Sequence, residues 1–164
     1  MSNQSKKIFL ALSIVIPFLF YCFYYYGMMV KNAPYKFSEF KSISFKYGLG
    51  DKLINQYSSE TDVYQYVNNK DSLIKKDVKL TKDDLLYLHR KAAQLGFWNF
   101  PSNMVNESPN TAPQYYIEFN YDRKGKKVLF DLDYNGDPKL KDAVRRLIEE
   151  ISNTIHDAEA RMPR

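Results

Sequence analysis

Cysteine, histidine and glycine are scarce in this sequence of 164 residues, which has one cysteine, two histidines and six glycines. A single cysteine excludes an intramolecular disulfide framework and a zinc site built from a cysteine cluster. The glycines form neither a Walker loop nor a dinucleotide-binding G-x-G-x-x-G. The G-x-S-x-G elbow of serine hydrolases is also missing. The common enzyme classes with short sequence signatures are therefore not indicated.

Charge is absent from one long segment, the 23 residues from Ile8 to Val30. As a helix this segment would be about 35 Å long, enough to cross a hydrocarbon core of about 30 Å. Several tyrosines crowd its C-terminal end, and amphipathic rings favour the lipid–water interface. We therefore predict a transmembrane helix over residues 8–30.

The flanks of this segment predict its orientation. Lys6 and Lys7 precede it and only Lys31 follows closely, so the positive-inside rule puts residues 1–7 in the cytoplasm and the rest of the chain outside. The small residues of a signal-peptide cleavage site are missing around Gly27 and Ala33. We therefore expect an uncleaved anchor, with cleavage and secretion as the alternative.

A strong excess of one charge sign is missing from the remaining chain. Three of the 24 basic residues flank the apolar segment, which leaves 21 against 19 acidic residues. This near balance does not have the electrostatic character of a nucleic-acid-binding protein. The overall composition, 45% hydrophobic and 26% charged, is typical of a folded protein.

The residues after the apolar segment predict one α+β domain over 42–164, joined to the anchor by a tether over residues 31–41. Alternating apolar residues predict strands, and so do runs rich in β-branched and aromatic residues. We expect about five strands in an antiparallel sheet with two helices on one face. The predicted strands cover residues 42–47, 61–67, 73–80, 115–121 and 128–134.

Local capping patterns predict the two helices of this domain. Thr81 followed by Asp84 has the pattern of a capping box, and Gly96 is a natural end for the first helix. Asp137 followed by a proline opens the second helix. Trp98 comes directly after the first helix between two phenylalanines, and we expect its side chain to be buried.

The segments LHRKAAQLGFWNFP, from residue 88, and SISFKYGLGD, from residue 42, resemble a family of small membrane-anchored proteins of unassigned function from bacterial envelopes. In a wider set of similar domains a helix ends in an aromatic F-[FW]-x-x-P corner before a hairpin. The resemblance covers most of the domain and implies a bacterial inner membrane location. Its motifs are packing motifs, so it carries over no catalytic residue.

An acidic segment before the second helix has the spacing of a calcium loop. Asp131, Asp133 and Asn135 stand at positions 1, 3 and 5, Asp137 follows a glycine, and Asp142 stands at position 12. The final Asp instead of Glu, a proline at the usual apolar position and an entering strand depart from the pattern. In the structural interpretation, which we favour, the first two aspartates face solvent and Asp137 caps the helix.

Histidines and tyrosines supply the other candidate residues. His89 lies beside the apolar stripe of the first helix and His156 in the last turn of the second, where structural roles are expected. Tyr64, Tyr66 and Tyr116 lie in predicted strands, where alternation should turn Tyr116 and one of the other two outward. Exposed tyrosine is a good contact residue for proteins and sugars.

These observations together favour a single-pass, envelope-facing binding module for a protein partner, with no cofactor and without enzymatic activity. One alternative is a cell-envelope hydrolase or carbohydrate-binding factor, which predicts a cleft near His89 or the loop over residues 102–113. A second alternative is a calcium-binding envelope protein that uses the acidic segment.

Overall fold

The computed structural model of this chain describes residues 3–31, 35–50, 52–106 and 112–162. The chain forms two units, Met1–Tyr35 and Lys36–Arg164. Helix α1 (Asn3–Lys31) belongs to the first unit, and its stretch Lys7–Tyr26 is long and apolar enough to cross a membrane. The large apolar side chains described in this stretch are exposed. The predicted N-terminal apolar helix is therefore confirmed, whereas its orientation stays a prediction.

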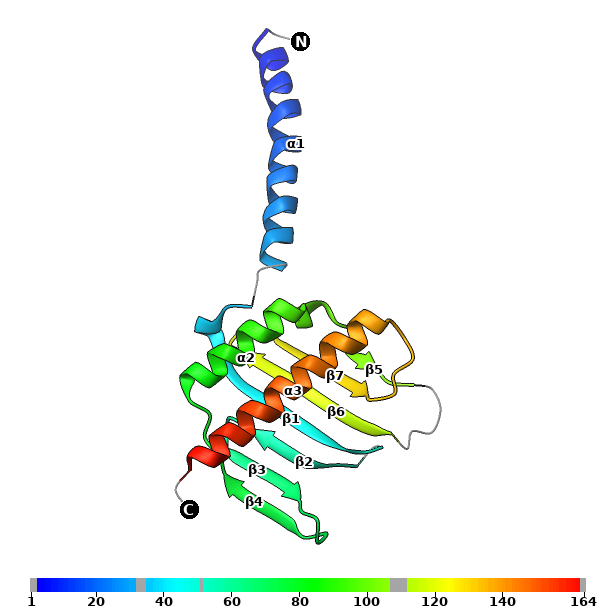
Figure 1. Cartoon of the computed structure of the whole chain (residues 1–164). Coiled ribbons are helices and arrows are strands. Elements are labelled where there is room, and N and C mark those ends of the chain that lie inside the picture. Colours follow the sequence, from blue (N-terminus) through cyan, green and yellow to red (C-terminus); the bar gives the residue numbers. More distant parts are fainter. Residues whose placement is uncertain (1–2, 32–34, 51, 107–111, 163–164) are drawn as a thin grey trace. The chain divides into compact units, whose positions relative to one another are not determined.

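The second unit is built around one mixed sheet with the strand order β4-β3-β2-β1-β6-β7-β5 (Figure 1). All neighbouring strands are antiparallel except β5 and β7, which run parallel. The strands are β1 (Phe40–Leu49), β2 (Lys52–Ser58), β3 (Val63–Val67), β4 (Leu73–Asp77), β5 (Asn103–Met104), β6 (Pro113–Tyr121) and β7 (Gly125–Asp131).

The sequence predicted five strands, and the described residues form seven. The two missed strands are β2 and β5. In β2 the apolar Leu53 and Ile54 are adjacent, which breaks the alternation that identifies a half-buried strand. Strand β5 has only two residues and no periodicity, and its parallel pairing with β7 makes the sheet mixed instead of purely antiparallel.

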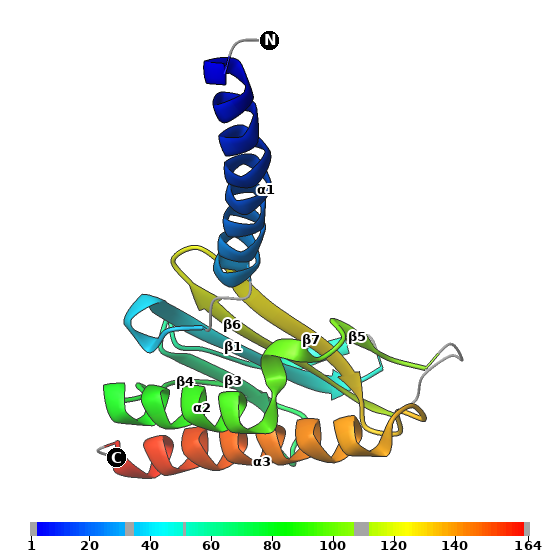
Figure 2. The ribbon, with the colours of Figure 1, turned by 90° about the horizontal axis from the view of Figure 1, so that it is seen from above.

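Helices α2 (Lys82–Leu95) and α3 (Pro138–Arg161) cover one face of the sheet, as predicted (Figure 2). The capping box is confirmed, because the Thr81 side chain accepts a hydrogen bond from the Asp84 N–H and the Asp84 side chain accepts one from the Thr81 N–H. Gly96 ends α2 in the left-handed region, with φ of 78°. The side chain of Asp137 caps α3 by accepting a hydrogen bond from the backbone of Lys139.

The hydrophobic core lies between these helices and the sheet. Alternate residues of each central strand point toward the helices, and α3 contributes an apolar stripe. Burying these apolar side chains is the main driving force for folding of this unit. Fully buried members of this core include Ile43, Phe45, Leu88, Phe97, Ile117, Phe119, Val128, Phe130, Val144, Leu147 and Ile151.

The prediction that Trp98 is buried is wrong, because its side chain is only half-buried. A short 3-10 helix, η2 (Phe97–Asn99), follows Gly96 and turns the neighbouring Phe97 into the core. The indole ring instead packs along the edge of Phe119, with ring centroids 5.4 Å apart, and of Tyr121, at 5.7 Å. Trp98 therefore covers the end of the core and does not fill it.

Candidate functional site

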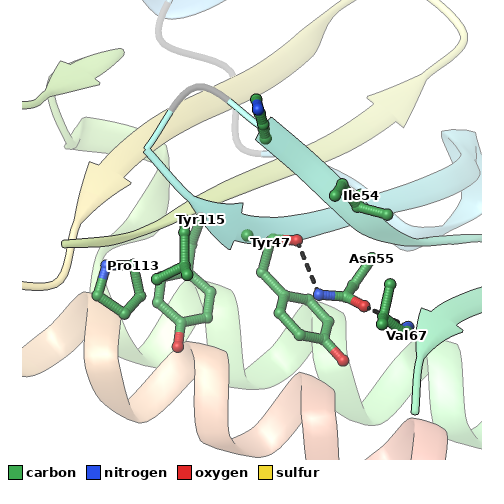
Figure 3. Close-up of a pocket in the computed structure, with 9 residues that line it drawn as sticks. Tyr47, Ile54, Asn55, Val67, Pro113 and Tyr115 are labelled. Carbon is green, nitrogen blue, oxygen red and sulfur yellow. Dashed lines mark hydrogen bonds between the residues drawn. The ribbon is translucent and has the colours of Figure 1, made fainter. Parts of the chain in front are cut away.

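A groove lies at the end of the hairpin formed by β1 and β2, with a volume of about 470 Å³. This is within the usual size range of small-molecule pockets. Strands β1, β2, β3 and β6 line it, and α2 and α3 contribute none of its described lining residues. We call it the hairpin groove (Figure 3). Its lining residues are Tyr47, Gly48, Leu49, Lys52, Ile54, Asn55, Val67, Pro113 and Tyr115.

Gly48 shapes the tip of the hairpin. The pairing of β1 with β2 shifts register between Tyr47 and Leu49. At this bulge the backbone of Lys52 approaches so closely that a Cβ on Gly48 would lie 1.8 Å from the Lys52 carbonyl oxygen. Only glycine leaves room for this approach. The bulged tip leaves the side chain of Leu49 69% exposed at the groove.

Side-chain amides bridge β2 and β3 where the two strands separate. The strands form ladder pairs only at one end, over three residue pairs. Beyond these pairs the Gln65 side chain donates to the Ile54 carbonyl at 2.9 Å, and the Val67 N–H donates to Asn55 Oδ1 at 2.8 Å. Asn55 Nδ2 in turn donates to the Tyr47 carbonyl at 3.2 Å. These hydrogen bonds satisfy backbone groups of β1, β2 and β3 beyond the end of the β2–β3 ladder, and the groove lies beside them.

Two tyrosines on neighbouring strands form one wall of the groove. The rings of Tyr47 and Tyr115 stack with their centroids 6.0 Å apart, and both side chains project from the same face of the sheet (Figure 3). The Tyr47 and Tyr64 hydroxyls form a hydrogen bond of 2.9 Å. Burial raises the pKa of Tyr64 and of Tyr115, so both hydroxyls stay protonated near neutral pH. The wall is neutral and largely apolar.

The structure does not bring the three predicted ligand-contacting tyrosines together. Tyr64 is buried beneath the groove, where it supports Tyr47. Tyr66 lies two residues farther along β3, packs on Tyr64 with ring centroids 4.9 Å apart and is half-buried. Tyr116 points to the opposite face of the sheet, beneath the ammonium group of Lys46. Sequence alternation alone identified neither Tyr47 nor Tyr115 as a site residue.

The expectation that Asp131 faces solvent is wrong, because this side chain is fully buried. One carboxylate oxygen accepts a hydrogen bond from the Asn106 N–H at 2.8 Å, and the other accepts one from the Gln114 amide at 2.9 Å. Asn106 also donates to Asp133 at 3.0 Å and accepts from the Asn135 N–H at 3.1 Å. Asn106, which the sequence analysis did not single out, therefore holds this segment.

The last two residues of the calcium pattern have other partners. Asp137 caps α3, as the structural interpretation predicted. Asp142 forms an ion pair with Arg146 at 2.9 Å. Within the described ranges no group of three or more histidines, cysteines, aspartates or glutamates could hold a metal ion. Asp131, Asp133, Asp137 and Asp142 therefore each interact with a different polar group within the protein.

Neither histidine is among the described lining residues of the hairpin groove, although the His156 ring lies 6.4 Å from the ring of Tyr64. His89 is 9% exposed, and its Nδ1 lies 2.7 Å from the Tyr121 hydroxyl. Its ring packs against Phe37 and Trp98, and burial, together with the charge of Arg90, lowers the pKa of the imidazole. His156 is exposed on α3. Residues 107–111 of the loop considered for the alternative cleft lie outside the described residues.

A comparison of the chain with protein-family models finds no match, and a comparison with curated proteins finds none either. The resemblance to small envelope proteins therefore stays a prediction.

Proposed function

We propose that this protein is a membrane-anchored binding module of a bacterial envelope, and that the hairpin groove is its binding site. The groove supports this proposal because it is concave, mostly apolar and bordered by exposed side chains. Leu49 and Ile54, which line it, are 69% and 46% exposed. Large apolar side chains that remain in water beside a cavity mark a surface that gains free energy when a ligand covers it.

The chemistry of the groove favours binding over catalysis. Acid–base catalysis needs titratable groups that converge on one point with suitable pKa values. None of the described lining residues is a histidine, cysteine, aspartate or glutamate. The hydroxyl of Tyr115 has a raised pKa and is a poor base near neutral pH. A hydrolase would need a different site, and His89, the buried histidine, contacts aromatic rings instead of a cleft.

Helix α1 supports the proposed anchor, because the described side chains of its apolar stretch are exposed. If Lys6 and Lys7 are in the cytoplasm, the domain is on the extracytoplasmic side of the membrane. A fusion of alkaline phosphatase after Arg164 should be active, and a cytoplasmic fluorescent reporter fused at the same position should be dark. The opposite pair of results would reverse the proposed orientation.

Crosslinking in cells tests the groove as the binding site. A photoreactive phenylalanine analogue at Ile54 of the full chain should form adducts that depend on light. The matched control is the same analogue at Tyr87 on α2, because its native side chain is 42% exposed, close to the 46% of Ile54. We expect adducts at position 54 that are absent at position 87 and lost in Tyr115→Ala. Equal or absent adducts at both positions would contradict binding in the groove.

A further inference from the structure

Several amide and carbonyl groups around the hairpin groove are already paired within the protein. The Asn55 side chain uses its oxygen for the Val67 N–H and its nitrogen for the Tyr47 carbonyl. The Ile54 carbonyl accepts from Gln65. A peptide that adds as a strand needs unpaired main-chain groups, and a sugar needs several free donors and acceptors. Because these described groups already have partners, the groove favours a ligand recognised mainly through apolar contact.

Among the described lining residues the charge is positive. Lys52 is the one charged residue among the described lining residues, and it is exposed and forms no ion pair with another described residue. A ligand with a negative head group would therefore complement Lys52.

The shape of the groove fits a narrow ligand better than a protein surface. Its volume of about 470 Å³ is typical of small-molecule pockets, whereas a standard protein interface buries about 800 Å² on each partner. The stacked rings of Tyr47 and Tyr115 provide an apolar wall on one face of the sheet, and Ile54 and Val67 also belong to the described lining. A hydrocarbon chain can pack against the two stacked rings.

We infer that the hairpin groove binds an anionic amphiphile, with its hydrocarbon chain against Tyr47 and Tyr115 and its carboxylate or phosphate head at Lys52. This inference rests on the proposed function, because it names the ligand class of the same groove. Two sources supply this chemistry: a free fatty acid, or an anionic lipid of the membrane that holds α1. Both sources share the negative head and the apolar chain.

A photoreactive dodecanoate tests the inference on the full chain in phosphatidylcholine nanodiscs. After illumination and digestion, mass spectrometry should locate the label in the segments around residues 47–55 and 113–115. Unlabelled dodecanoate should compete for these segments at least about tenfold better than dodecyltrimethylammonium, which corresponds to about 1.4 kcal/mol. Nanodiscs doped with phosphatidic acid distinguish the sources: loss of label indicates a membrane lipid, and unchanged label indicates a free fatty acid.

Charge variants test the role assigned to Lys52. Lys52→Glu should lower specific labelling about tenfold, whereas Lys52→Arg should retain it. Lys75→Glu is the matched control, because Lys75 is also an exposed strand lysine but lies outside the groove. The fluorescence of Trp98, the only tryptophan, verifies that each variant is folded.

The outcomes separate this inference from the proposed function. Equal competition by the cationic amphiphile, or full labelling of Lys52→Glu, would overturn the assignment of an anionic ligand while leaving the groove a binding site. No label in the groove, together with adducts from the analogue at Ile54, would overturn the ligand class alone. Failure of both experiments would overturn the proposed function as well.

Discussion

Replacing Gly48 with alanine should destabilise the hairpin that forms the groove. The new Cβ would lie 1.8 Å from the Lys52 carbonyl oxygen, so the two backbones must part by about 1.5 Å to reach an ordinary contact. The obstructing atom is backbone and cannot rotate away. Overpacking of this kind typically costs 1–3 kcal/mol, and each lost hydrogen bond about 1 kcal/mol. We expect a loss of about 2–3 kcal/mol, which would lower Tm by about 6–10 °C in a domain of this size.

Trp98 fluorescence during urea unfolding of the full chain in detergent measures this loss, because α1 contains no tryptophan. The control is Gly125→Ala, whose Cβ would meet only the Asn120 side chain at 3.1 Å and the Phe119 carbonyl at 3.5 Å. Gly125→Ala should change stability by less than about 1 kcal/mol. If Gly48→Ala shows the wild-type midpoint and wild-type amide exchange in β1 and β2, the close approach does not constrain the hairpin.

Four further substitutions test other parts of the domain. Burial lowers the pKa of His89 below its ordinary 6.5, so the unfolded state takes up the proton more readily and stability is lost as pH falls below about 6.5. His89→Gln should make the urea midpoint less dependent on pH between pH 7 and 5. A wild-type midpoint independent of pH would contradict the burial of the imidazole. Trp98→Ala should lower the free energy of unfolding, followed by near-ultraviolet circular dichroism, by about 2–3 kcal/mol, which is less than the ~3–5 kcal/mol of a fully buried ring. A larger loss would mean that the indole is part of the core. Asp131→Asn should lower the free energy of unfolding by about 1–3 kcal/mol, because the new amide N–H would face an N–H donor. Asp137→Ala should lower it by about 1 kcal/mol through loss of the helix cap. A calcium-dependent rise in Tm that Asp131→Asn abolishes would instead establish the calcium loop.

The helices could be predicted from sequence because their signals are local. The Thr81 cap, the Gly96 end and the Asp137 cap each depend on residues within one turn. The strands β1, β6 and β7 were predictable for the same reason, since alternation is visible along a single strand. The β2 strand was not, because its pairing with β1 and the amide bonds beyond its short ladder with β3 replace the usual pattern.

The candidate site was harder to predict because its parts come from distant segments. Tyr47 and Tyr115 are partners across β1 and β6, a relationship that no local pattern reveals. Alternation along β7 turns Asp131 away from the core, but this side chain is buried because Asn106 and Gln114, from distant segments, donate hydrogen bonds to its two oxygens. The closely spaced glycines around Leu49 were the available local signal, since they indicate a tight turn where exposed side chains collect.

The position of β1 in the sheet has a consequence for how the domain folds during synthesis. This strand is the first of the sheet to be made, yet it lies in the middle of the seven described strands, between β2 and β6. Its second partner arrives much later in the chain, since Phe45 pairs with Ile117. Until β6 emerges, one edge of β1 and the inner face that carries Phe45 have no β6 to pack against. The central pairing of β1 with β6 can therefore form only after most of the domain has been synthesised. This order favours slow folding and a long period in which the apolar face and one edge of β1 are exposed.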